Sequence, residues 1–185
     1  MLKTMELNLY KSPSQKFSKS LVQIKYAQLI YNDLERMDNV QKLELKKKFL
    51  VNSYYINLIA LWQTFIEELL SDSVTHLISK SSIEIGKILE INLNNRLKKM
   101  SNPNAENIED NIKFLIGYEK VLNDLPNDLN AKIEINKILK IRHSIAHTGF
   151  SDTYIDIESN FETMHYLLNI AEKLEEIIFK RIDKN

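Results

Sequence analysis

The segment FLVNSYYINLIALWQTFIEELL, residues 49–70, decides the fold because its apolar side chains occupy nearly every side of a helix. A helix that is apolar almost all round is packed on several sides, as the central helix of a bundle is. The same periodicity extends from about residue 40 to residue 79, where we expect a helix with or without an interruption. The sequence therefore predicts an all-α helical bundle with a long central helix.

Three further long helices are expected around this segment, at residues 13–37, 129–147 and 157–182. Ser12 followed by Pro13 is typical of a helix start. Gly149 supplies a stop after the second of these, the helix expected at residues 129–147. We expect that helix to turn its branched aliphatic side chains inward, namely Ile133, Ile135, Ile138, Leu139 and Ile145.

The remaining segments predict shorter helices. The loop at residues 101–104 separates a helix over residues 82–100 from a short one that Gly117 could end. Alternating β-branched residues closed by a turn signal are missing, so we expect no sheet. In the helix before the loop, the side chains expected to point inward are Ile83, Ile88 and Leu89.

The composition limits the setting of the protein. The chain has 185 residues, which suits one domain, and we expect that domain to span residues 1–185. It has no cysteine, which excludes disulfides and thiolate metal sites and makes a reducing cytoplasm the natural setting. We find neither a secretory signal nor a run of roughly 18 apolar residues, and so expect neither export nor a membrane span.

The charge is balanced, with 25 basic and 25 acidic residues. This disfavours stable, nonspecific binding of nucleic acid, but it is compatible with a local basic pocket or a transient encounter. Residues 46–48 and the group Arg96, Lys98 and Lys99 are basic clusters, and a solvated helix face is the default interpretation of both. Four aromatic side chains could stack on bases, but their alternation with aliphatic residues favours core packing: Tyr54, Tyr55, Trp62 and Phe65.

Reactive side chains concentrate in the segment IRHSIAHTG, residues 141–149, which contains two of the four histidines. At about 100° per residue, His143 and His147 share one helical face, whereas Arg142 lies about 140° from His147. Arg142 and His147 can act on one substrate only if the helix loosens near Ala146 or if the arginine wraps around the surface. From spacing alone, helix capping is favoured over catalysis, because basic residues complement the negative end of the helix dipole.

Other chemistries are less favoured by the pattern. His143 and His147 could ligate zinc, with a third ligand from His76, His165 or a distant carboxylate, but no glutamate occupies the metalloprotease position. The glycines are isolated, which excludes a phosphate-binding P-loop. We expect no metal and no cofactor.

Three segments carry a family resemblance. Arg142 and His147, with four residues between them, lie at the end of the penultimate long helix. Residues 61–69, LWQTFIEEL, form an aromatic-rich core followed by acidic residues, and residues 154–157, YIDI, precede the last helix. Over roughly residues 49–179, this arrangement resembles the RiboL-PSP-HEPN branch of the HEPN superfamily.

The resemblance implies a metal-independent endoribonuclease, commonly a toxin or an anti-phage defence effector. The RNA 2′-hydroxyl would attack the adjacent phosphate and leave a cyclic phosphate and a 5′-hydroxyl. Arg142 would stabilise charge on the phosphate, and His147 would transfer protons. The branch often has asparagine after the arginine, whereas His143 stands here. That histidine could orient a phosphate, act as a second acid–base group, or mark an inactive copy.

The resemblance also implies partners. We expect RNA as a transient substrate and a homodimer in which two Arg142–His147 motifs face each other across a common groove. The last helix is the expected dimer surface, because its apolar stripe at residues 161–178 is longer than one internal contact needs. An antitoxin or another neutralising protein is a further candidate partner. The competing hypothesis is a catalytically inactive helical interaction module, such as an antitoxin-like or assembly subunit.

Overall fold

The computed structural model describes the chain except for residues 1–10, 38–40, 150, 152 and 185. Across this described part the regular structure is entirely helical, which confirms the all-α prediction. The elements follow in chain order as α1 (Pro13–Arg36), α2 (Leu43–Ser79), α3 (Ile83–Lys99), α4 (Ala105–Ile116), the 3₁₀ turns η1 (Val121–Asp124) and η2 (Asn127–Leu129), α5 (Ala131–Thr148) and α6 (Ile157–Lys184).

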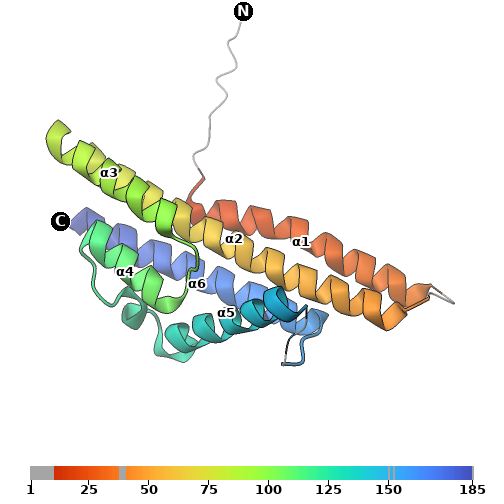
Figure 1. Ribbon diagram of the computed structural model, residues 1–185. Coiled ribbons are helices and arrows are strands. Elements are labelled where there is room, and N and C mark those ends of the chain that lie inside the picture. The colour runs from red at the N-terminus through yellow and green to blue at the C-terminus, as the bar shows by residue number, and fades with distance from the viewer. Residues whose placement is uncertain (1–10, 38–40, 150, 152, 185) are drawn as a thin grey trace, which may run out of the picture.

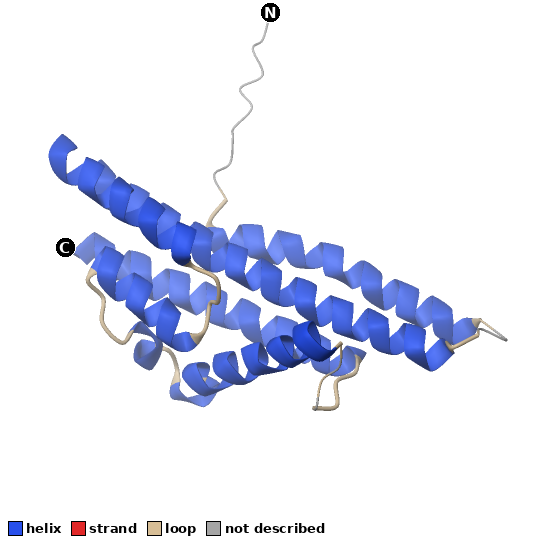
Figure 2. Cartoon of the chain, viewed as in Figure 1, coloured by secondary structure: helices blue, strands red, loops and turns tan. Residues whose placement is uncertain are grey.

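The long helix α2 lies at the centre of the bundle and contacts each of the other α-helices. From Leu43 to Ser79 it is one continuous helix, so the interruption that the sequence allowed is not present in this range. The expected start near residue 40 lies outside the described residues. Figure 1 shows α1, α2 and α6 as long helices lying side by side, with α4 and α5 across one side of them. The helix α3 projects with the end of α2 at one end of the bundle, and Figure 2 shows the loops that join the helices.

The aromatic side chains of α2 form the core and are not available for stacking on bases. Tyr54, Tyr55, Trp62 and Phe65 are all fully buried. Phe17 of α1 lies against this group, with its ring centroid 5.4 Å from that of Phe65. The interpretation of these residues as core is therefore confirmed. The expectation that residues 49–70 pack on several sides is confirmed, but one side of this segment remains exposed. Phe49 is 74% exposed there, and Asn57, Ala60 and Thr64 follow on the same side of α2.

The apolar stripe of α6 is covered by the chain's own helices. Its central residues are buried in the same hydrophobic cluster as the α2 aromatics, and α6 contacts both α1 and α2. The expectation that this stripe is spare surface for a second copy is therefore wrong, because two internal helices cover it. The buried side chains of the stripe are Met164, Leu167, Ala171, Leu174 and Ile178.

The helix α3 is less buried than the sequence predicts. Ile83 and Ile88 are 75% and 59% exposed, so their predicted inward position is wrong, whereas Leu89 packs against the core. The physical reason is that α3 extends beyond the bundle, so its outer face meets none of the other helices that the structure describes (Figure 1). Its close approach to α2 occurs at buried Gly86, where an added Cβ would lie 3.2 Å from the Ile78 side chain.

Local signals set the helix ends as predicted. Pro13 is the first residue of α1, and Gly117 ends α4 in the left-handed conformation, with φ of 74°. The Asn104 side chain accepts from the backbone N–H of Asn107 and caps the start of α4. None of the helices formed by the described residues is both long enough and apolar enough to cross a membrane.

Candidate functional site

The segment singled out by the sequence forms the last turns of α5. The helix remains α-helical through Thr148, and Gly149 follows with φ of 75° and donates its N–H to the Ile145 carbonyl at 2.9 Å. Glycine adopts this left-handed conformation without the Cβ clash that other residues suffer. The predicted stop is confirmed. Ile133, expected to point inward, is instead 67% exposed, because it lies on the outer face of α5.

The three candidate residues lie on the surface near this helix end. Arg142, His143 and His147 are all exposed. The His143 and His147 rings are neighbours, with centroids 4.2 Å apart and planes inclined by 53°. The helix does not loosen near Ala146, so Arg142 keeps its angular offset of about 140° from His147. The structure thus pairs the two histidines, whereas Arg142 could act beside them only by extending its long side chain around the helix.

Two side chains from α2 hold this part of α5 by its backbone. The Asn52 side chain donates from Nδ2 to the Gly149 carbonyl at 3.0 Å. The Tyr55 hydroxyl donates to the Ile138 carbonyl at 3.2 Å inside the core. Burial, with a smaller contribution from Glu134, raises the pKa of the Tyr55 phenol, which therefore remains a hydrogen-bond donor. These bonds fix the position of the candidate site relative to the central helix.

The role of Asn52 was not predicted from the sequence. Its side chain is 7% exposed, and it lies in the otherwise apolar first half of the segment 49–70. A polar residue in such a segment needs a hydrogen-bond partner when it is buried. The presence of asparagine in an apolar segment therefore indicates a buried hydrogen bond, but the sequence does not show which distant carbonyl accepts it. The structure identifies it as Gly149, which is the residue that ends α5.

An apolar groove of about 300 Å³ adjoins the end of α5. Ile145 and Gly149 line one side, and Leu45, Phe49 and Ile56 of α2 line the other. Leu45 and Phe49 also line a second groove, of about 380 Å³, between α1 and α2. These two large apolar side chains are exposed and lie between two concave surfaces next to the candidate site.

The possibility of a metal site at the two histidines depends on further ligands nearby. In the described residues, no group of three or more histidine, cysteine, aspartate or glutamate side chains is arranged to hold a metal ion. Within the residues that the structure describes, the zinc interpretation of His143 and His147 therefore finds no third ligand. The residues that it named as candidates lie elsewhere: His76 is bonded to Asp183 at 2.8 Å, and His165 lies on the exposed side of α6.

Comparison with known proteins identifies the family of this fold. The family profile described as RiboL-PSP-HEPN matches residues 19–180, which includes all of α2 to α5 and most of α1 and α6. The chain belongs to the RiboL-PSP-HEPN family, as the resemblance of its sequence predicts. No curated protein and no solved structure matched the chain.

Proposed function

We propose that the protein is a metal-independent endoribonuclease whose site is built on Arg142, His143 and His147. The observation that carries the proposal is the exposed His143–His147 pair, with ring centroids 4.2 Å apart, beside an exposed arginine in a chain of the RiboL-PSP-HEPN family. Cleavage of RNA by its own 2′-hydroxyl needs a proton acceptor, a proton donor and a cation. These three side chains are of the types that supply those groups.

Each residue has a distinct role in this proposal. His147 removes the proton from the 2′-hydroxyl as that oxygen attacks phosphorus. An imidazolium, from His143 or from the facing motif, protonates the departing 5′-oxygen, so that the proton count balances. The Arg142 guanidinium binds the nonbridging phosphate oxygens as negative charge builds on them. Because no step calls for a metal ion, the reaction proceeds in a chelator.

A homodimer would complete the site. We propose that two copies meet through the surface formed by Leu45 and Phe49, in place of the α6 stripe that the fold covers. This surface is next to the end of α5, and it has protruding side chains beside grooves of about 300 and 380 Å³. An isologous interface needs such self-complementarity, since each patch meets an identical one. A stable dimer of this kind buries more than about 1,000 Å² in total.

The dimer surface can be tested apart from catalysis. Phe49→Ser removes a side chain that is 74% exposed, so the folded monomer should keep its stability. The dissociation constant of the dimer should increase. Ile83→Ser on α3, where the side chain is 75% exposed, is the matched control and should leave the dimer intact. Sedimentation velocity over a concentration series distinguishes the two. Equal behaviour of both variants would show that the dimer surface lies elsewhere.

The catalytic roles are tested by substitution and by mixing subunits. His147→Ala should lower RNA cleavage by about 100-fold or more, whereas His165→Ala, which changes an exposed histidine on α6, should not. Co-purified heterodimers of Arg142→Ala and His147→Ala subunits retain one intact copy of each residue. They should cleave faster than either homodimer. Heterodimers as inactive as the two homodimers would contradict a site shared between subunits.

One observation favours the second candidate function, a catalytically inactive interaction module. The helix α5 is regular through Thr148, which leaves Arg142 and His147 on different sides of it. In that case the basic residues serve only the end of the helix. The His147→Ala comparison decides between the two functions, because the inactive module has no cleavage to lose. A role as a toxin or defence effector, with a neutralising partner protein, belongs to the catalytic proposal alone.

A further inference from the structure

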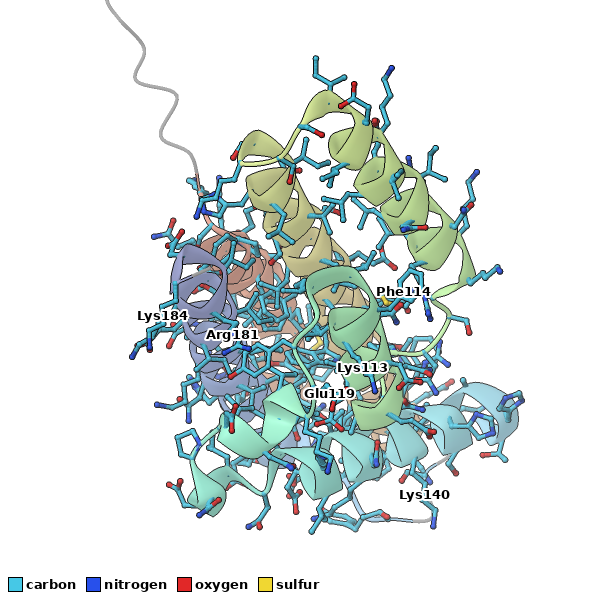
Figure 3. All side chains as sticks on the ribbon, turned by 90° about the vertical axis from the view of Figure 1, so that its left-hand side faces the viewer. Lys113, Phe114, Glu119, Lys140, Arg181 and Lys184 are labelled. Carbon is cyan, nitrogen blue, oxygen red and sulfur yellow. The ribbon has the colours of Figure 1, made fainter. Side chains whose placement is uncertain are left out.

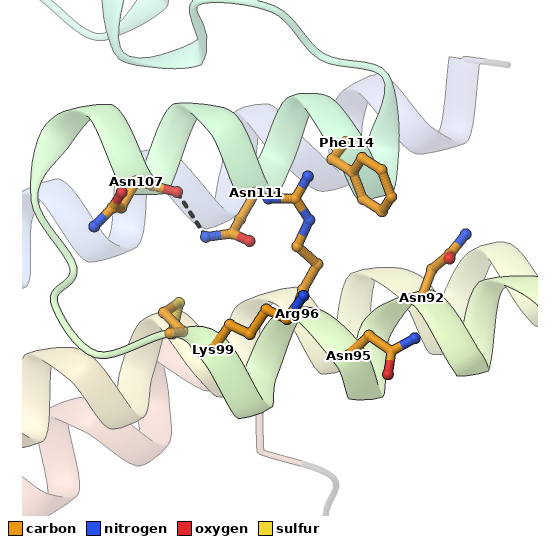
Figure 4. Close-up of a pocket in the computed structure, with 8 residues that line it drawn as sticks. Asn92, Asn95, Arg96, Lys99, Asn107, Asn111 and Phe114 are labelled. Atoms are coloured by element: carbon orange, nitrogen blue, oxygen red, sulfur yellow. Dashed lines mark hydrogen bonds between the residues drawn. The ribbon is translucent and has the colours of Figure 1, made fainter.

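A separate pocket lies between α3 and α4, away from the two grooves beside Phe49. It has a volume of about 440 Å³, and Figure 4 shows its lining side chains facing one another from the two helices. Arg96 and Lys99 enter from α3, and none of the lining residues is acidic. Neither cation forms an ion pair with another residue in the described part of the chain. The pocket therefore has a local positive charge within a protein whose net charge is zero.

A cation–aromatic pair forms one side of this pocket. The Arg96 guanidinium carbon lies 3.9 Å from the centroid of the Phe114 ring. Figure 3 shows Phe114 on the side of α4 that faces α3, and 52% of its side chain remains exposed. Guanidinium and aromatic planes are both surfaces on which nucleobases stack. The pair is thus already assembled and still open to a third planar group.

Asparagine amides line the rest of the pocket, from Asn92 and Asn95 on α3 and from Asn107 and Asn111 on α4. Asn111 is 7% exposed, and its Nδ2 donates to the Asn107 carbonyl at 2.7 Å. That bond fixes the amide, and Figure 4 shows its oxygen turned toward the Arg96 side of the pocket. The Asn107 amide also has one N–H engaged, by the Asn102 carbonyl at 2.7 Å. Each amide still has a second N–H and an oxygen, which matches the mixed donors and acceptors at the edge of a nucleobase.

We propose that the α3–α4 pocket binds a nucleotide, with its base on the Arg96–Phe114 pair and its phosphate on Lys99. The volume lies in the range of small-ligand pockets, about 300–1,000 Å³. A purely anionic ligand would explain the cations and could accept from the amide N–H groups, but it would make no use of the exposed aromatic ring or of the amide oxygens. The site lies toward the opposite end of the bundle from the C-terminal end of α5 (Figure 1). Binding there does not depend on the proposed cleavage.

The ligand could be a free nucleotide or one nucleotide of an RNA strand, and the two share the same chemistry. The test uses the full chain with His147→Ala, so that no RNA is cut. The four nucleoside 5′-monophosphates and a short single-stranded oligoribonucleotide are titrated separately by isothermal calorimetry or NMR. Binding of a monophosphate identifies a free nucleotide as ligand. Binding of the oligoribonucleotide alone identifies an RNA strand. Both results support the proposal.

Variants then place the ligand in this pocket. Phe114→Ala and Arg96→Gln should each weaken binding by about tenfold or more, because each removes half of the stacking pair. Lys99→Gln should weaken binding of the nucleotide but not of the matching nucleoside, which lacks the phosphate. Lys98→Gln, one position along α3 and outside the pocket, is the matched control and should change neither.

Two results would overturn the proposal. One is no heat or chemical-shift change with any monophosphate or with the oligoribonucleotide. The other is binding that Phe114→Ala and Arg96→Gln leave unchanged, which would place the ligand elsewhere. Circular dichroism of both variants confirms that they are folded, as expected because the Phe114 side chain is half exposed and Arg96 only partly buried. Since cleavage is absent from these experiments, their failure is distinct from failure of the proposed function.

Discussion

Substitution of Asn52 should show whether this residue positions the end of α5, because the variant is expected to lose little stability but much RNA cleavage. Asn52→Ala removes the 3.0 Å hydrogen bond to the Gly149 carbonyl. A neutral hydrogen bond contributes about 0.5–1.5 kcal/mol net. Gly149 is exposed, so water can replace the lost donor at its carbonyl, and we expect a loss of about 1 kcal/mol in the free energy of unfolding. For a chain of this length, that lowers Tm by about 2–4 °C.

The effect on RNA cleavage should exceed this modest loss of stability. Asn52 is a side chain of α2 that holds the residue ending α5, and His147 is only two positions before that residue. A catalytic group displaced by about 1 Å can lose on the order of 100-fold in rate. We therefore expect cleavage by Asn52→Ala to fall at least about tenfold at a temperature where the protein remains fully folded.

Asn160 provides the matched control. Its Nδ2 donates to the carbonyl of Val51, also at 3.0 Å, and so joins α6 to the residue that precedes Asn52 on α2. Asn160 is fully buried, so Asn160→Ala should lower stability by at least as much, about 1–3 kcal/mol. The bond does not involve α5, and cleavage per folded molecule should remain close to that of the wild type.

Thermal unfolding followed by circular dichroism measures stability, and single-turnover cleavage of a labelled RNA measures activity, well below the Tm of each variant. If Asn52→Ala loses the expected stability but cleaves as fast as the wild type, the bond does not position the site. If both variants lose cleavage equally, the loss reflects general destabilisation, and the reasoning fails as well.

Two further predictions concern helix ends. Gly149→Ala and Gly117→Ala each place a side chain at φ near 75°, with open space around the new Cβ. Each should therefore lower the free energy of unfolding in urea by about 1–2 kcal/mol. Only Gly149→Ala should also slow RNA cleavage. Equal cleavage by both variants would contradict a role for the α5 end. Hydrogen bonds from His76 and Lys80 hold the pKa of the Asp183 carboxyl below its ordinary 3.8. The stability that these hydrogen bonds add to the folded state is fully present above the unfolded-state pKa of Asp183. It is lost as pH falls through the lower folded-state pKa. The free energy of unfolding, measured by denaturant titration, should therefore fall less for Asp183→Asn than for the wild type between about pH 7 and about pH 3. An equal fall in the two proteins would contradict this.

The sequence predicted those parts of the fold that local physics decides. The apolar segment around Trp62 is the centre of the core, and left-handed Gly117 and Gly149 end their helices where the pattern placed the stops. The sequence also located the exposed histidine pair, because residues four apart on a helix are neighbours whatever surrounds the helix. These features need no knowledge of tertiary contacts.

Features set by contacts between distant segments could not be predicted in this way. Ile83 is as apolar as any core residue, but the direction in which α3 leaves the bundle exposes it. The α6 stripe seemed too long for one internal contact, because the sequence does not show that α1 and α2 both cover it. Likewise, Arg96 and Phe114 have no relation by spacing, and only the packing of α3 beside α4 stacks them.

The most direct test of the central claim is the chemistry of the cut. The purified protein is incubated with RNA in excess EDTA, alongside a matched substrate carrying a single 2′-deoxynucleotide immediately 5′ of the mapped cleavage position. The account predicts cleavage of the all-ribose strand, with 2′,3′-cyclic phosphate and 5′-hydroxyl ends, and no cleavage at the deoxy position. RNA that remains intact, cleavage that stops in EDTA, or cleavage that continues at the deoxy position would contradict a metal-independent endoribonuclease acting through the 2′-hydroxyl.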